Sequence, residues 1–379
     1  MKYFACAFAL VAYVAGALFI PTTIFAETST IETVWSVDVD QRLPNSPIAL
    51  SQPAVVSHGD ETWLVLAGRD GWVHVYNAVS GSEERRFLLG SPSDSGALAL
   101  SNGTVILGDI HGHLYAVDPD KEEIIWQKSL TAAFTTSPIA MDNDFIIQTA
   151  DNELYRFASN GEKRWSYTGL KNTLSLYLGA KPVVQGEYIY AVLNNGDAVK
   201  IKAYTGDLLW KTQTMAGAAS ILLSLQAPLA QPLLVSGVRL AGEQVNNGLL
   251  VPIFQGEMAV LSAEDGSQSF SLPVSLKSSP LLVGDDMYMA ESTGYLHMYN
   301  THSGKRIWSH KISSHALMGP VLFDGSLWLT DNQGSVFRIN MNGEIEDTIQ
   351  LAGSIAREPL LTQEGLIIRT DRGVMALVK

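Results

Sequence analysis

Cysteine, basic residues and long apolar runs are all scarce in this chain. Its 379 residues include one cysteine, Cys6, and 25 Lys and Arg against 38 Asp and Glu, which gives a formal net charge of −13. Because affinity for phosphate backbones comes from clustered Lys and Arg, this balance argues against a general nucleic-acid binder. Beyond Ala26 no uninterrupted apolar stretch approaches the roughly 18 residues of a membrane span.

The N-terminal segment has the pattern of an export signal. Lys2 is followed by residues 3–25 without a charge, and Ala26 stands where a signal peptidase would cut, so we expect a signal peptide at 1–26. An uncleaved anchor is the alternative, since 23 uncharged residues are long enough to span a bilayer. Cys6 lies inside this segment, so the mature chain would have no disulfide, no cysteine-ligated metal and no catalytic thiol.

The remainder of the chain is a repeat. In each unit one residue with a preference for tight turns precedes a short apolar strand, at successive intervals of 41, 40, 44, 60, 38, 40 and 39 residues. Asparagine replaces glycine once, as expected for a turn that needs positive φ. The eight turn residues are Gly71, Gly112, Asn152, Gly196, Gly256, Gly294, Gly334 and Gly373.

A column of prolines supports the same period. Five prolines lie 14 residues before the turn residue, and Pro53 and Pro232 lie 18 and 24 residues before theirs. Because proline cannot donate to a sheet ladder, the column predicts the start of the innermost strand of each unit. The five are Pro138, Pro182, Pro280, Pro320 and Pro359.

A third column places an aromatic residue, usually tryptophan, on the last strand of a unit. Trp165, Trp210 and Trp308 each follow a glycine-containing turn, and we expect them to pack between units. Eight antiparallel units of about 40 residues predict an all-β, eight-bladed β-propeller, a single domain over residues 27–379. The last unit lacks its aromatic strand, and residues 33–37 form such a strand with no unit before it. We therefore expect the N- and C-terminal strands to share one blade and close the ring.

Residues 300–308 resemble the repeat of the pyrroloquinoline-quinone (PQQ) superfamily of eight-bladed propellers. That superfamily holds quinoprotein dehydrogenases as well as proteins without a cofactor. Residues 279–297 resemble a blade of its BamB-type subunits, and Leu174 and Leu176 match the loop by which those subunits dock the barrel-assembly subunit. The resemblance implies a non-enzymatic periplasmic scaffold, peripheral at the outer membrane of a Gram-negative-type envelope, which supports insertion of β-barrel proteins there.

Three departures accompany this resemblance. Tyr177 stands where the BamB-type loop has arginine, and residues 227–231 lack the paired aspartates of that family. A lipid-bearing cysteine is also missing, because only five residues precede Cys6. These departures leave open a paralogous scaffold that serves a different envelope complex.

Two connections between units are unusually long. Trp165 and Pro182 are 17 residues apart, and Trp210 and Pro232 are 22 apart, against 10 to 12 in the connections that lead to Pro138, Pro280 and Pro320. Both leave neighbouring blades by the same edge and are apolar, which favours a protein-binding patch, with edge-strand pairing as one docking mode. The alternative is that the two loops fold over the propeller and bury each other. The predicted partner-binding residues are Leu174, Leu176, Tyr177, Leu178, Ile221, Leu222, Leu223, Leu225 and Leu229.

The sequence gives little indication of a catalytic or metal-binding site. His111 and His113 would share one face of a strand, but His74 and His297 occur in other units, so we expect no metal site. A quinoprotein dehydrogenase, or another small-ligand propeller, is the competing hypothesis and would need an axial pocket for PQQ and Ca²⁺. We expect neither enzyme activity nor cofactor, but a monomer within a larger protein complex.

Overall fold

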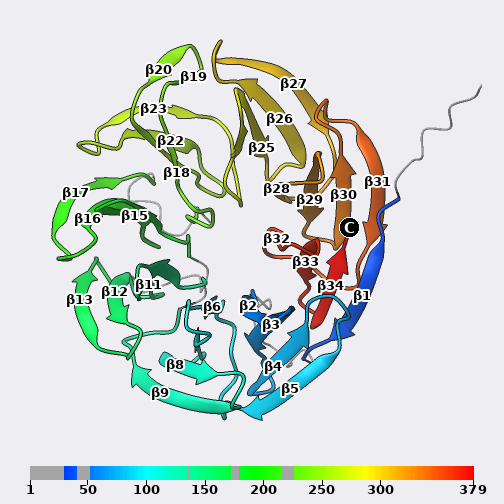
Figure 1. Cartoon of the computed structure of the whole chain (residues 1–379). Helices are drawn as coiled ribbons and strands as arrows, with labels where there is room; N and C mark the ends of the chain where they lie inside the picture. The colour runs from blue at the N-terminus through cyan, green and yellow to red at the C-terminus, as the bar shows by residue number, and fades with distance from the viewer. Residues whose placement is uncertain (1–29, 41–51, 135, 172–178, 216–225) are drawn as a thin grey trace, which may run out of the picture.

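Eight four-stranded antiparallel sheets stand around a central axis in the computed structural model (Figure 1). The structure describes residues 30–40, 52–134, 136–171, 179–215 and 226–379. The prediction of an eight-bladed all-β propeller is confirmed. The expected signal segment lies outside the described residues, so its cleavage stays a prediction.

The blades follow one another along the chain, each running from the axis outward. The first four blades are β2 (Ala54–His58), β3 (Glu61–Ala67), β4 (Trp72–Asn77) and β5 (Glu83–Leu88); β6 (Leu98–Ala99), β7 (Val105–Gly108), β8 (His113–Asp118) and β9 (Glu123–Ser129); β10 (Ile139–Met141), β11 (Asp144–Gln148), β12 (Glu153–Ala158) and β13 (Lys163–Thr168); and β14 (Val183–Gln185), β15 (Tyr188–Val192), β16 (Asp197–Lys202) and β17 (Leu208–Gln213). The other four are β18 (Leu233–Val235), β21 (Gly248–Val251), β22 (Met258–Ser262) and β23 (Gln268–Leu272); β24 (Leu281–Val283), β25 (Asp286–Ala290), β26 (Tyr295–Asn300) and β27 (Lys305–Lys311); β28 (Leu317–Phe323), β29 (Ser326–Asp331), β30 (Ser335–Ile339) and β31 (Ile345–Gln350); and β32 (Leu360–Leu361), β33 (Leu366–Arg369), β34 (Val374–Val378) and β1 (Thr33–Asp38).

The eighth blade closes the ring as the sequence predicts. Strand β1 pairs antiparallel with β34, with Trp35 opposite Leu377. The backbones of Glu32 and Lys379 exchange two hydrogen bonds, of 2.9 and 3.0 Å. In Figure 1 the blue β1 therefore lies beside the red β34. Pairing the two ends of the chain in one sheet removes the free edges that an open ring would expose.

The turn residues behave as predicted in seven of the eight blades. Asn152 has a φ of 70°, which confirms the positive φ that the asparagine substitution predicted. In the fifth blade the residue with positive φ is Gln255 rather than the following glycine, Gly256. The turn glycines with positive φ are Gly71, Gly112, Gly196, Gly294, Gly334 and Gly373.

The proline column also marks the innermost strands. Pro138, Pro182, Pro280 and Pro359 each stand immediately before the first strand of their blade. Pro320 differs, because it lies inside β28, where the pairing with β29 shifts register between Met318 and Val321. A bulge of this kind accommodates a residue that cannot donate to the ladder.

The closing tryptophans pack against the turn of the next blade, as predicted. A Cβ atom at Gly206 would come within 2.8 Å of the Trp165 ring, and one at Gly81 within 2.6 Å of Trp35. The indole Nε1 of Trp165 donates to the backbone oxygen of Ala203 at 2.9 Å. These turns therefore need glycine for the close approach as well as for positive φ. The same contact recurs for Trp126 on Gly161, Trp210 on Gly266 and Trp308 on Gly343.

The fifth blade carries an additional hairpin, β19 (Val238–Leu240) and β20 (Glu243–Val245). This hairpin accounts for the 24 residues between Pro232 and the turn residue Gly256, against 14 in five other blades. At Gly304 of the next blade, the nearest neighbours of an added Cβ are Gly242 and Arg239 of this hairpin instead of a tryptophan. The hairpin therefore takes the place that the closing tryptophan has in five of the other junctions.

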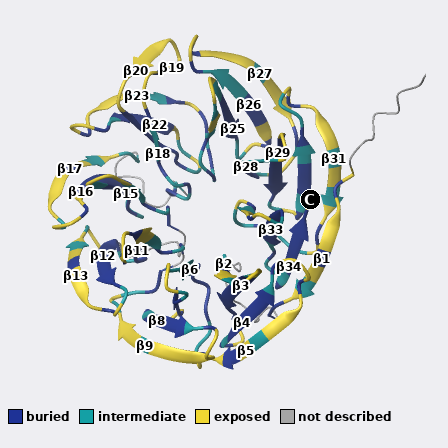
Figure 2. Ribbon diagram, viewed as in Figure 1, coloured by how far each residue is buried: buried dark blue, intermediate teal, exposed yellow. Residues whose placement is uncertain are grey.

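The hydrophobic core lies between neighbouring blades. One cluster, for example, joins Trp63 and Val65 of β3 to Leu107 of β7. Figure 2 shows that exposed residues gather on the outermost strands, such as β5, β9, β13 and β31. Among the described residues no helix is long and apolar enough to cross a membrane.

Candidate functional site

One face of the ring carries the connections from each outermost strand to the next innermost strand. Since the strands of a blade alternate in direction, these connections share that face with the turns between the second and third strands. Residues that end the connections stand next to the innermost strands and so surround the axis. This arrangement makes the axial end of this face a meeting point for residues from most of the blades.

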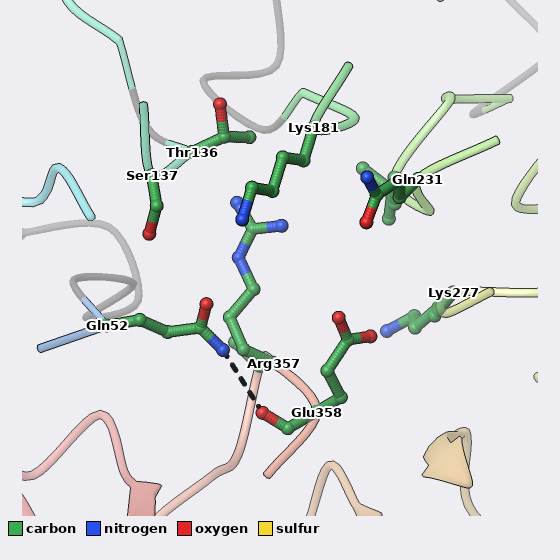
Figure 3. A pocket seen from close by; sticks show the side chains of 10 residues that line it. Gln52, Thr136, Ser137, Lys181, Gln231, Lys277, Arg357 and Glu358 are labelled. Carbon is green, nitrogen blue, oxygen red and sulfur yellow. Dashed lines mark hydrogen bonds between the residues drawn. The ribbon is translucent and has the colours of Figure 1, made fainter. Parts of the chain in front are cut away.

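A cavity of about 40 Å³ opens at that meeting point. Six of the connections contribute to it, so it lies on the ring axis. Figure 3 shows the polar and charged side chains around this common space. The lining residues are Gln52, Thr136, Ser137, Lys181, Leu229, Gln231, Lys277, Ala356, Arg357 and Glu358.

The ends of the two long connections meet at this cavity. The side-chain amide of Gln231 donates a hydrogen bond of 3.0 Å to the backbone oxygen of Pro182. Leu229 and Lys181, which lie just before these two positions, both line the cavity. The described ends of the two connections are therefore neighbours on one face.

Asn152 holds the beginning of the first long connection. Its buried side chain donates to the backbone oxygen of Leu170 at 2.7 Å and accepts from the backbone N–H of Asn194 at 2.7 Å. The backbone N–H of Gly169 donates to the Asn152 carbonyl at 2.9 Å. The turn of the third blade thus fixes where this connection leaves, and the Leu170 side chain next to it is 65% exposed.

Of the nine predicted partner-binding residues, the structure describes one. Leu229 is half-buried and lines the axial cavity. The other eight fall outside the described residues: Leu174, Leu176, Tyr177, Leu178, Ile221, Leu222, Leu223 and Leu225. Their part in docking stays a prediction.

Enclosure within the ring shifts the pKa values of the charged side chains at the cavity. Desolvation lowers the pKa of Lys181 and of Lys277 below the ordinary lysine value. The Glu358 side chain is exposed to the cavity but is surrounded by the blades of the ring. Desolvation by these surroundings raises the pKa of Glu358, although the positive charges of Arg357 and Lys181 act to lower it. The Lys277 ammonium also lies 4.7 Å from the centre of the Phe254 ring. Three basic groups and one acidic group therefore share the partly enclosed space at the axis.

The histidines are spread over the ring, as the sequence predicts. Each of the three that follow a turn pairs with acidic residues of its own blade: His74 with Asp70 and Glu83, His113 with Asp109, and His297 with Glu291. Within the described ranges no group of three or more His, Cys, Asp or Glu residues could hold a metal ion.

Apart from Leu229, none of the residues that line the axial cavity was predicted as a site residue, although the proline column contained the signal for them. Several lining residues stand directly before the proline that opens an innermost strand, and others stand two or three positions before it. Because that strand lies nearest the axis, the residue in front of it is placed beside the axis in every blade. The residues at that position that line the cavity are Gln52, Ser137, Lys181, Gln231 and Glu358.

The cavity does not fit the cofactor of a quinoprotein. Sites for ligands of that size have volumes of roughly 300–1,000 Å³, whereas this cavity has about 40 Å³. The Ca²⁺ that accompanies PQQ needs carboxylate and amide oxygens, and among the lining residues that the structure describes Glu358 is the only carboxylate, beside three cations.

Comparison with known proteins matches the chain to one family over most of its length. The family model described as "Outer membrane protein assembly factor BamB" matches residues 69–257 and 224–377. The chain is 25% identical over 365 residues to the outer membrane protein assembly factor BamB of Burkholderia pseudomallei, with 93% of this chain and 89% of that relative covered.

Solved structures show the same architecture. The crystal structure of BamB from Moraxella catarrhalis superposes with a TM-score of 0.74 at 18% identity, covering 92% of this chain and all of that one. A europium-containing methanol dehydrogenase superposes with a TM-score of 0.67 at 10% identity, covering 89% of this chain and 84% of that one. At these identities the structures establish the fold, and function must be argued from the site.

Proposed function

This chain belongs to the family of outer membrane protein assembly factor BamB, and we propose that it is a non-enzymatic periplasmic scaffold that supports assembly of β-barrel proteins into the outer membrane. Its proposed place is the periplasmic side of that membrane in a Gram-negative-type envelope. Its proposed partner is the barrel-assembly subunit of the same machinery.

The observation that carries this proposal is the contact between the two long connections. The hydrogen bond from Gln231 to Pro182 places their ends side by side on one face. Loops on a rigid ring are suited to recognition, because the scaffold fixes their positions while their sequences remain free to vary. The apolar residues predicted within both connections would then form one continuous docking patch.

Partner capture from envelope extracts tests the proposal. Leu174→Asp and Leu223→Asp each place a charge in one of the two connections, and each is expected to reduce recovery of the barrel-assembly subunit at least about tenfold, since burying an uncompensated charge is costly. Leu208→Asp is the matched control, because Leu208 lies on the outermost strand β17 and is 43% exposed. Equal recovery by all three variants and the wild type would refute the docking patch.

A paralogous scaffold for a different envelope complex is the second candidate. Tyr177, in place of the arginine of BamB-type loops, and the absence of paired aspartates in residues 227–231 favour it. The same capture experiment separates the two candidates, because recovery of a different envelope protein that depends on Leu174 would support the paralogue.

A further inference from the structure

The axial cavity brings together three basic side chains and a single carboxylate among its described lining residues. Lys181, Lys277 and Arg357 come from three different blade junctions, and the one carboxylate that accompanies them is Glu358. Throughout the described ranges, none of these four groups makes an ion pair within 4.0 Å. The chain has a net charge of −13, so this concentration of cations does not follow from a basic composition.

Among the described residues Arg357 has no carboxylate within ion-pair distance, unlike three other enclosed arginines of the protein. Its Nη2 atom is buried and has no hydrogen-bond partner. By contrast, buried arginines elsewhere in the ring hold carboxylates: Arg69 holds Asp94 at 2.6 Å, Arg156 holds Asp144 at 2.6 Å, and Arg369 holds Asp40 at 3.3 Å. A buried guanidinium N–H without an acceptor costs free energy of folding. The unpartnered Nη2 of Arg357 therefore indicates that an acceptor is supplied from outside the chain.

We propose that the axial cavity binds a small oxyanion with Arg357, Lys181 and Lys277 as its ligands. A volume of about 40 Å³ has room for about three water molecules at roughly 10–15 Å³ each, which suits an inorganic phosphate or a short carboxylate. The planar guanidinium of arginine is shaped to donate two parallel hydrogen bonds to such a group.

The other lining residues complete this site. The hydroxyl groups of Thr136 and Ser137 offer neutral donors on a further side of the cavity. Gln52 orients the Glu358 segment, because its side-chain amide donates to the Glu358 backbone oxygen at 3.2 Å (Figure 3). The Glu358 carboxylate faces the same space and repels an incoming anion, which limits the affinity. The proposal concerns the axis and does not depend on the docking patch.

Calorimetric titration of the exported full-length protein with inorganic phosphate, and separately with succinate, tests the proposal at low ionic strength. We expect saturable one-to-one binding of at least one of the two with a Kd of about 1 mM or tighter; which of them binds identifies the anion class. Lys277→Gln and Arg357→Gln are expected to weaken that binding at least about tenfold. Glu358→Gln is expected to strengthen it, the opposite direction.

Lys202→Gln is the matched control. Lys202 is exposed at the end of β16, on the face opposite the cavity, and its replacement is expected to leave the Kd unchanged. In a buffer without oxyanions, Lys277→Gln and Arg357→Gln are expected to melt at or above the wild-type temperature, because each relieves repulsion between cations. Absence of saturable binding to the wild type, an unchanged Kd in both cation variants, or a lower melting temperature of both would overturn the proposal.

Discussion

The side-chain amide of Gln231 donates to the backbone oxygen of Pro182 at 3.0 Å and so ties the fourth blade junction to the third. Gln231→Ala removes this tie and leaves the Pro182 oxygen without that donor. We expect the free energy of unfolding to fall by about 1 kcal/mol, measured by urea denaturation, together with reduced partner capture. Gln244→Ala is the control, since the side-chain amide of Gln244 donates to the Val238 backbone oxygen within its own hairpin. Equal losses in both variants would contradict a special role for Gln231.

The contact of Trp165 with Gly206 predicts a large effect of a single methyl group. Gly206→Ala places a Cβ atom 2.8 Å from the indole ring at a φ of 78°, and we expect a loss of about 2–4 kcal/mol from overpacking and backbone strain together. Gly186→Ala separates the two causes, because Gly186 has a φ of 58° and nothing within 4 Å. Its expected loss is about 1 kcal/mol from the backbone alone. Similar urea midpoints for the two variants would show that the ring contact contributes nothing.

Asp40, just after the closing strand β1, bonds residues of both the first and the last blade, so we expect it to support closure of the ring. This buried carboxylate accepts from the backbone N–H of Arg69 at 2.8 Å and from the Arg369 guanidinium at 3.3 Å, across 329 positions of the chain. Since the pKa of Arg369 is already lowered by desolvation, Asp40→Asn is expected to cost about 3 kcal/mol of unfolding free energy.

The control for Asp40 is an ion pair at the surface, between the exposed Lys121 and the half-buried Asp118. Asp118→Asn breaks the contact with Lys121, which is open to solvent, and its unfolding free energy is expected to stay close to that of the wild type. Hydrogen exchange of β1 and β34 gives a second readout, because only Asp40→Asn should speed exchange in the closing blade. Unchanged exchange of β1 and β34 in Asp40→Asn would show that the Asp40 bonds do not support closure of the ring.

A pH dependence is expected from His74. Burial alone lowers its pKa, but hydrogen bonds and charge from Asp70 and Glu83 outweigh burial, so the pKa lies above the ordinary 6.5. A raised pKa in the folded state means that the contribution to stability is fully present below pH 6.5 and is lost as the pH rises through the folded-state value. Unfolding free energies measured between pH 6 and pH 9 should therefore fall more in the wild type than in His74→Gln.

His302→Gln provides the comparison for that measurement, because His302 is exposed in a turn of the sixth blade. It should retain the wild-type pH profile. The pKa of Asp70 is lowered, since its bonds to His74 outweigh desolvation, so the contribution of Asp70 should be lost only as the pH falls through its folded-state pKa, below 3.8. A wild-type profile for His74→Gln would contradict the assignment.

The local features of the blades could be predicted from the sequence because each is set within a few residues. Asn152 substitutes for glycine at a positive φ, and Pro182 opens an innermost strand, for reasons that hold in any tight turn or sheet edge. Repetition of the turn residue eight times and of the proline seven times predicts the ring, since similar units that cannot bury both faces alone must stack and close. The closing blade followed from the unpaired Trp35 strand for the same reason.

The charged lining of the axial cavity, by contrast, is set by the tertiary structure. Lys181, Arg357 and Gln52 lie far apart in the chain and meet because radial closure places the front of every innermost strand beside one axis. The repeat predicts the position of each, but not the charge that stands there, because no local rule selects a lysine in one blade and a serine in another. The same holds for the β19–β20 hairpin, whose contact with Gly304 replaces an aromatic ring and depends on two blades meeting. The folded ring, by holding these side chains together and partly shielding them from water, turns unremarkable positions in a repeat into a charged site.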